Sequence, residues 1–182
     1  MKKIILIFMF LCLWAFVCTA EESDPFLLAA AGTPEQMQAA YNRGVRFNVK
    51  DEADKTPLHD AAISNHNPES IRFLIQQGID VNAEWQTGTG FTPLLTAVLN
   101  YNAEAVEELL KNAAAPNFTD GNLSSVLQHA VTLDKKPAER KRIVSALIKA
   151  GADVNYHDDI SNSSALASAV TDIADVQRKI SE

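Results

Sequence analysis

Short apolar segments recur along the chain at helical spacing, and they occur in pairs. The second segment of a pair has apolar residues one helical turn apart, as at Ile71, Leu74 and Ile75. The first segment is rich in alanine and follows a Thr or Ser, which can cap the free N–H groups at a helix start. The first segments lie at 56–62, 92–98 and 125–131, and the second segments at 71–75, 106–110 and 143–148. The pattern predicts pairs of short helices.

An eight-residue phrase that ends in Asn recurs at the close of these pairs. It reads IQQGIDVN at 75–82 and IKAGADVN at 148–155, with weaker copies YNRGVRFN at 41–48 and LKNAAAPN at 110–117. Its fourth residue is Gly44, Gly78, Ala113 or Gly151, so successive copies are 34, 35 and 38 residues apart. A Gly at this place ends a helix in a left-handed conformation. Such a period is typical of a solenoid, in which each helix pair buries its apolar face against its neighbours.

These motifs resemble those of the ankyrin-repeat family. The likeness is carried by TPLHDAA at 56–62 followed by LIQQGIDVN at 74–82, and by ALIKAGADVN at 146–155. It implies an all-α solenoid of stacked helix-turn-helix units with β-hairpin fingers on one side. The ankyrin-repeat domain is expected at 24–182, with a capping repeat at 24–49, repeats at 50–83, 84–118 and 119–156, and a partial capping repeat at 157–182.

The first 20 residues have a different character from the rest. Lys2 and Lys3 precede an apolar run at 4–17, and the small residues of Cys18-Thr19-Ala20 precede Glu21. This order is typical of a Sec signal peptide at 1–20, cleaved after Ala20. The run is shorter than the ~20 residues that a membrane span needs, although an uncleaved anchor is the alternative. We expect export, to a bacterial periplasm or else to the extracellular space, with no stable membrane insertion after cleavage.

The formal net charge is −7 at pH 7, and loss of Lys2 and Lys3 with the signal would make it −9. An acidic surface argues against nucleic acid as a partner and favours a basic protein, although solubility alone also explains it. Both cysteines, Cys12 and Cys18, lie within the predicted signal. The mature chain would therefore have no disulfide, and its stability would come from packing.

The sequence departs from the family pattern at three places. The finger at 83–91 is two residues longer than its predecessor and contains Trp85. Asp54 replaces the usual finger Gly, at a position where a left-handed conformation is expected. Four extra residues are expected in the turn between the two helices of the fourth unit. This stretch, 135–142, holds five Lys and Arg residues, and it is either a binding patch or a solvated loop and helix start.

No pattern of catalytic or cofactor-binding residues is present in the sequence. The four histidines (His59, His66, His129 and His157) lack metal-ligand spacing, and the phosphate-binding, dinucleotide-binding and nucleophile motifs are missing. His59 falls in the helix-capping motif, where we expect a structural role. We therefore predict a protein that is not an enzyme and needs no cofactor or metal, with an unrecognised hydrolase as the outside alternative.

The resemblance and the predicted signal together lead us to expect an exported module that binds a protein partner, and we expect it to be a monomer. A second hypothesis is a periplasmic immunity or inhibitor protein that neutralises a basic toxin or enzyme. The binding face is expected on the solvent side of the first helices and on the finger tips. Its candidate residues are Asp60, Ser64, Thr96, Asn100, His129 and Leu133 on the helices, with Glu52, Trp85, Gln86 and Thr87 on the fingers. Trp85 is either an interface anchor or a side chain that packs on the neighbouring repeat.

Overall fold

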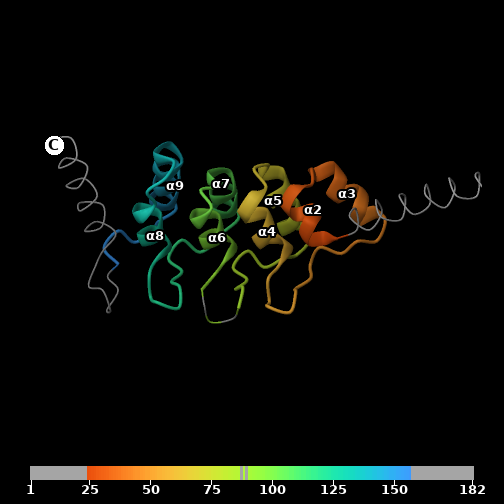
Figure 1. The fold of residues 1–182 in the computed structure, drawn as a ribbon, viewed down its shortest axis with the longest axis horizontal. Helices are drawn as coiled ribbons and strands as arrows, with labels where there is room; N and C mark the ends of the chain where they lie inside the picture. The colour runs from red at the N-terminus through yellow and green to blue at the C-terminus, as the bar shows by residue number, and fades with distance from the viewer. Residues whose placement is uncertain (1–23, 87, 89, 157–182) are drawn as a thin grey trace, which may run out of the picture.

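The computed structural model describes residues 24–86, 88 and 90–156. In this part of the chain, four helix pairs stack side by side in chain order, and hairpin fingers extend from one side (Figure 1). The pairs are α2 (Pro25–Ala31) with α3 (Pro34–Asn42), α4 (Pro57–Ser64) with α5 (Pro68–Gln76), α6 (Pro93–Leu99) with α7 (Ala103–Lys111), and α8 (Val126–Thr132) with α9 (Pro137–Lys149). The expected all-α solenoid is confirmed. The predicted signal at 1–20 and the closing repeat at 157–182 lie outside the described residues.

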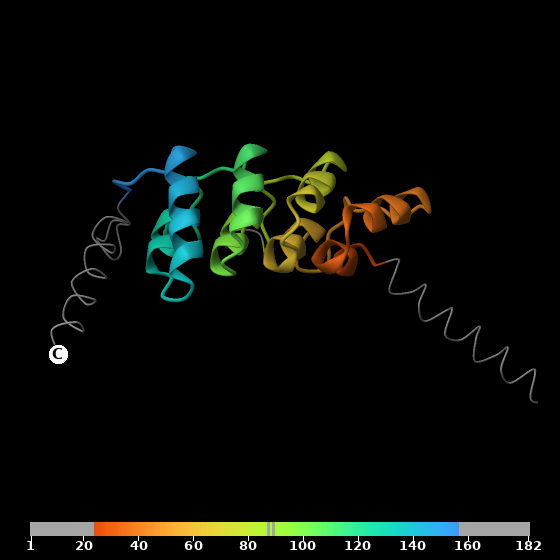
Figure 2. The ribbon, with the colours of Figure 1, turned by 90° about the horizontal axis from the view of Figure 1, so that it is seen from above.

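The first helix of each pair faces the fingers, and the second helices form an outer row. Figure 2 shows α5, α7 and α9 running alongside one another in this row, while α3 is turned away from their direction. None of the helices in the described residues is long and apolar enough to cross a membrane.

Capping residues begin the helices as the sequence predicts. The Thr92 hydroxyl accepts a hydrogen bond from the Leu95 N–H at 3.3 Å. Ser125 and Gln128 form a reciprocal capping box, because each side chain accepts from the backbone N–H of the other, at 3.2 and 2.7 Å. Six of the eight described helices also begin at a proline, whose fixed φ angle suits the first helical position.

Left-handed residues follow the second helices, which confirms the predicted stop. Gly44, Gly78 and Gly151 have φ angles of 104°, 85° and 91°. Ala113 takes the same conformation with a φ of 64°, although its Cβ makes this unfavourable. Asp54 also has a positive φ, 63°, as predicted for its place in the first finger.

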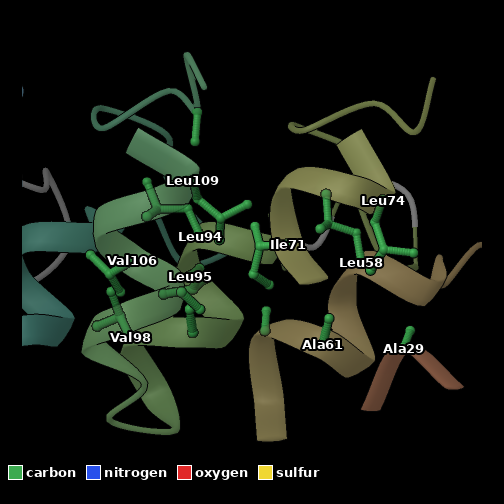
Figure 3. Close-up of a cluster of buried hydrophobic side chains, with 14 of the residues drawn as sticks. Ala29, Leu58, Ala61, Ile71, Leu74, Leu94, Leu95, Val98, Val106 and Leu109 are labelled. Carbon is green, nitrogen blue, oxygen red and sulfur yellow. The ribbon is translucent and has the colours of Figure 1, made fainter. Parts of the chain in front are cut away.

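The core forms where equivalent positions of neighbouring repeats meet (Figure 3). Each first helix has an alanine five residues after its cap, and all four of these described side chains are fully buried. They are Ala29, Ala61, Ala97 and Ala130. Their small size lets the first helices lie close together. Leu74, Leu109 and Leu147 occupy equivalent, fully buried positions four residues before the left-handed stop.

Asparagines join each repeat to the next. Asn48 donates from Nδ2 to the carbonyl of Gly78 at 3.1 Å, and Asn117 donates to the carbonyl of Gly151 at 3.1 Å. The Asn82 side-chain oxygen accepts from the Ala115 N–H at 2.8 Å. These are the asparagines that end the repeated phrase, so the phrase encodes both a helix stop and a link between repeats.

A second set of asparagines occupies the turns between paired helices. Asn65 donates to the carbonyls of Ala29 and Gly32 at 2.9 and 3.0 Å. Asn102 donates to the carbonyls of Ala62 and Asn65, both at 3.1 Å. Both side chains are buried, and each one satisfies carbonyl groups of the preceding repeat.

The four extra residues of the fourth unit lengthen a helix, so their expected placement in the turn was wrong. The turn at 133–136 is followed by α9, which has 13 residues where α3, α5 and α7 each have nine. Pro137 begins this helix directly after Lys136, which has a left-handed φ of 48°. A continuous helix satisfies its own backbone groups, which a longer turn would have to pair with water or side chains.

We predict that Ala113→Gly stabilises the protein by about 1 kcal/mol, because glycine adopts the left-handed conformation without a steric penalty. Urea unfolding monitored by circular dichroism measures the change. Gly44→Ala is the matched control, since a Cβ at Gly44 would meet nothing within 4 Å and any loss of stability then reports backbone strain. A lower stability of Ala113→Gly would contradict the prediction.

Candidate functional site

Two of the three described fingers share one construction. In finger 1 (residues 51–55), the Asp51 carboxylate accepts from the N–H groups of Ala53 and Lys55, both at 2.9 Å. In finger 3 (residues 120–124), the Asp120 carboxylate accepts from Asn122 and Ser124 at the same distance. Each aspartate therefore holds a tight turn, and the exposed Glu52, Gly121 and Asn122 lie at the tips.

Finger 2 (residues 85–91) closes differently because it is longer. The Trp85 N–H donates to the Phe91 carbonyl at 3.0 Å, and the Glu84 carboxylate accepts from the N–H groups of Gly88 and Gly90 at 3.0 and 3.3 Å. The exposed Gln86 links the finger to finger 1, since its N–H donates to the Ala53 carbonyl at 2.8 Å. Thr87, a predicted site residue, lies outside the described residues.

Glycine is required at position 90 because finger 2 lies against finger 3. A Cβ at Gly90 would lie 2.5 Å from the Cα of Asp120, and the Gly90 φ angle is 71°. The fingers therefore form a continuous row whose spacing is fixed by backbone contact.

The Trp85 ring packs on the preceding repeat. Its centroid is 6.3 Å from that of the His59 ring and 6.5 Å from that of Phe91. Lys55 Nζ lies 5.4 Å from the Trp85 centroid and 5.7 Å from that of Phe26, while it forms an ion pair with Asp60 at 3.1 Å. This geometry agrees with the packing alternative for Trp85, whose side chain remains partly exposed.

His59 ties the cap of α4 to finger 2. Its Nδ1 lies 3.1 Å from the Thr56 backbone nitrogen, which can only donate, so Nδ1 accepts. Nε2 then carries the proton and donates to the Phe91 carbonyl at 3.0 Å. Burial lowers the pKa of His59, because the surroundings disfavour the charged ring. The neutral ring is therefore structural, in keeping with the expected role.

The predicted site residues on α4 are held by local contacts. Asp60 is partly buried beside Lys55, and burial raises the pKa of its carboxyl group, an effect that Lys55 partly opposes. The Ser64 hydroxyl donates to the Ala30 carbonyl at 3.1 Å and so spans to the preceding repeat. Both side chains remain at the surface beside the fingers.

Thr96 was predicted to face solvent, and that placement is wrong. Its side chain is buried, and within the described residues its Oγ1 atom has no hydrogen-bond partner. The neighbouring first helices pack closely enough on the buried alanines to cover this position. Asn100, one turn later, is exposed and donates to the Thr96 carbonyl at 2.9 Å.

On α8 and just beyond it, the predicted residues are partly buried. His129 Nε2 lies 2.9 Å from the Asp120 carboxylate, which joins the helix to finger 3. Leu133 packs against the core. The structure thus leaves Glu52, Gln86 and Asn100 exposed, links the first two fingers through Gln86, and commits several of the other predicted residues to packing.

Sequence reasoning missed several exposed apolar side chains. Leu27 of α2, Phe91 of finger 2 and Leu123 of finger 3 are 47%, 38% and 43% exposed. Leu123 is also left-handed, with a φ of 62°, at the place where finger 1 has Asp54. Aligning the two fingers on Asp51 and Asp120 would have found it, because a leucine is unusual at a left-handed position.

Among the residues that the structure describes, no three His, Cys, Asp or Glu side chains gather so that they could hold a metal ion.

Known proteins share these repeats. The family model described as ankyrin repeats (three copies) matches residues 26–120. A putative ankyrin repeat protein of Rickettsia felis is 30% identical over 93 residues, which cover 51% of this chain and 24% of the relative. An ankyrin repeat and KH domain-containing protein of Caenorhabditis briggsae is 36% identical over an alignment of 164 residues, which covers 75% of this chain and 6% of the relative. The chain therefore spans about a quarter of the first relative and far less of the second.

We predict that His59 makes the protein less stable in mild acid. Because folding lowers the pKa of His59, the unfolded chain takes up its proton first as the pH falls through about 6.5, and stability decreases from there. His59→Gln should remove this part of the decrease, since glutamine at the same capping position (Gln36 and Gln128) accepts the same backbone bond without titrating. Circular-dichroism melts between about pH 7.5 and 5.5 measure both proteins. Parallel pH dependences would contradict the assignment.

Proposed function

The chain belongs to the ankyrin-repeat family, whose members are typically non-enzymatic protein-interaction modules, and we propose that it binds a protein partner through its fingers and first helices. The proposal requires neither a cofactor nor catalysis, and it treats the protein as a monomer.

Leu123 is the observation that carries this proposal. A left-handed leucine is strained by roughly 1–2 kcal/mol, whereas aspartate at the matching place in finger 1 tolerates the conformation better. The side chain is 43% exposed, so packing offsets only part of that strain. The shared finger turn requires the left-handed conformation, as at Asp54, but it does not require an exposed leucine there. Strained residues are concentrated at binding sites. A partner that buries Leu123 would use the apolar surface that the fold leaves uncovered.

The surroundings of Leu123 fit a protein interface. Phe91 of the adjacent finger 2 adds exposed apolar surface, and Glu52 and Gln86 on the fingers, with Asn100 after α6, supply exposed polar groups. Protein interfaces combine a small apolar centre with a polar rim in this way. Trp85 supports the surface from beneath, because its ring holds finger 2 against His59 and Lys55.

We predict that Leu123→Gly weakens partner binding while it leaves folding stability unchanged or raised. Glycine relieves the backbone strain, but loss of an apolar anchor typically costs about 2 kcal/mol, or roughly thirtyfold in Kd. Affinity capture from the host, with mass spectrometry to identify the retained protein, gives the partner. Titration calorimetry and thermal melts then compare wild type with the variant.

Trp85→Ala is the matched control for this experiment, since it should lower the melting temperature by removing packing. A photo-crosslinker at Asn122 should label the partner, whereas one at Gln76 on the outer helix α5 should not. Unchanged affinity of Leu123→Gly would refute the assignment of Leu123.

The excess of acidic over basic residues favours a more specific function within the same proposal. A chain of net charge −7 whose finger 1 tip carries Glu52 suits a basic partner, such as a toxin or enzyme that the protein would neutralise. Such a complex should weaken steeply with salt and should inhibit the partner. A partner that binds equally well in high salt would count against the immunity or inhibitor role.

Export is a separate proposal and rests on residues 1–20. The two lysines, the apolar run and the small residues before Glu21 suit a cleaved signal and a periplasmic or extracellular location. We predict a mature protein that begins at Glu21, which N-terminal sequencing of the soluble envelope fraction would detect. An intact Met1 in the membrane fraction would instead support the anchor alternative.

A further inference from the structure

The lengthened helix α9 forms one wall of a groove on the outer row of helices. The groove has a volume of about 770 Å³ and lies between α7 and α9, which run side by side in Figures 1 and 2. Ala138, Ser145 and Ala146 of α9 line it, together with Ala150, which caps the C-terminal end of that helix. Their small side chains leave the groove open, with Leu110 of α7 opposite.

The groove is basic although the chain as a whole is acidic. Its described lining includes four basic side chains (Lys111, Lys141, Arg142 and Lys149) and one acidic side chain (Glu107). The formal charge of the whole chain is −7, so these four residues concentrate positive charge on a small area. Neighbouring carboxylates offset part of this charge, and a ligand in the groove would meet the part that remains.

Two of the four basic side chains are already held by neighbouring carboxylates. Arg142 contacts Glu104 at 2.8 Å and Glu107 at 3.1 Å, and Lys111 lies 3.4 Å from the buried Glu108. These pairs fix the walls of the groove by joining α9 to α7 and by holding Lys111 on α7. Lys141 and Lys149 are exposed, and the ion pairs found within the described residues do not include them.

A further groove on the outer row has a different charge. It lies between α3 and α5, has a volume of about 630 Å³, and includes Glu35, Glu69 and Arg72 in its lining. Arg72 contacts Glu69 at 2.7 Å and the buried Glu108 at 2.9 Å, so its charge is compensated. The groove between α3 and α5 therefore lacks the basic character of the groove at the lengthened fourth unit.

We propose that the groove between α7 and α9 is a second docking site, which binds an acidic segment of a partner protein. Carboxylates of the segment would pair with Lys141 and Lys149 on the rim, and an apolar side chain would lie on Leu110 and Ala146. The site is on the outer helices, whereas the proposed finger surface is on the first helices. The two sites can therefore be occupied and tested independently.

The charge distribution favours a short acidic segment over an extended anionic surface. Screening at physiological salt limits the reach of a charge to about 8 Å, so a segment within the groove interacts with the local lysines. A membrane or a nucleic acid would extend beyond the groove and face the acidic remainder of the chain.

Fluorescence anisotropy with a labelled peptide of repeating Glu-Glu-Leu-Leu tests the proposal on the purified full chain. We expect saturable binding that weakens with salt and is absent for the Gln-Gln-Leu-Leu peptide. Lys141→Glu combined with Lys149→Glu should weaken binding at least tenfold, or about 1.4 kcal/mol. Ser145→Phe should also weaken it, because the ring would fill the groove without a change in charge.

The control variant combines Arg46→Glu with Lys50→Glu, which makes the same change in net charge away from the groove and should leave peptide affinity unchanged. Leu123→Gly should bind the peptide normally, so that loss of the finger site and loss of the groove are distinguished. Circular-dichroism melts verify that each variant is folded. Equal affinity of the double Lys variant, equal binding of the Gln peptide, or no binding at all would refute the proposal. Preferential binding of phosphatidylglycerol vesicles or of single-stranded DNA through the same lysines would refute the choice of ligand.

Discussion

The hydrogen bond from one repeat's closing asparagine to the next repeat's backbone is the constraint on which the rest of the structure depends. Asn48, Asn82 and Asn117 each bind a backbone group about one repeat further along the chain. A helix pair cannot bury its apolar face alone, so neighbouring pairs must meet in one register. These bonds hold that register together with the buried bonds of Asn65 and Asn102, which pair carbonyl groups that stacking would otherwise leave unsatisfied. When the repeats stack in this register, the buried alanines of neighbouring first helices meet and the fingers form one row.

Local signals made most of the fold predictable from the sequence. Caps such as Ser125, stops such as Gly78 and buried leucines such as Leu74 depend on residues within a few positions, so periodicity shows them. The asparagines that join the repeats were visible in the sequence as a recurring residue. Their hydrogen-bond partners lie about 30 residues or more away, and only the folded chain reveals them. The extra turn of α9 was misplaced because residue intervals do not distinguish a longer turn from a longer helix.

The candidate site was harder to predict because exposure at a finger depends on contacts between repeats. Thr96 and Asn100 lie one helical turn apart, yet the close packing of the first helices covers only Thr96. Trp85 suggested an anchor by its residue type, but His59 and Lys55 of the preceding repeat hold its ring. Leu123 gave a usable signal only by comparison with Asp54. Conformation, more than residue type, distinguishes it from an ordinary surface leucine.

The solenoid allows the two proposed surfaces to change independently. Four added residues make α9 longer than the other outer helices, yet the Asn117 bond to the Gly151 carbonyl is kept at 3.1 Å. The insertion therefore extends the outer row while the fingers and first helices keep their register. Because each repeat contacts only its neighbours, such a change is confined to the units around it. Arg142 then joins α9 to Glu104 and Glu107 of the adjacent repeat. These ion pairs hold the lengthened helix in place as one wall of the groove between α7 and α9.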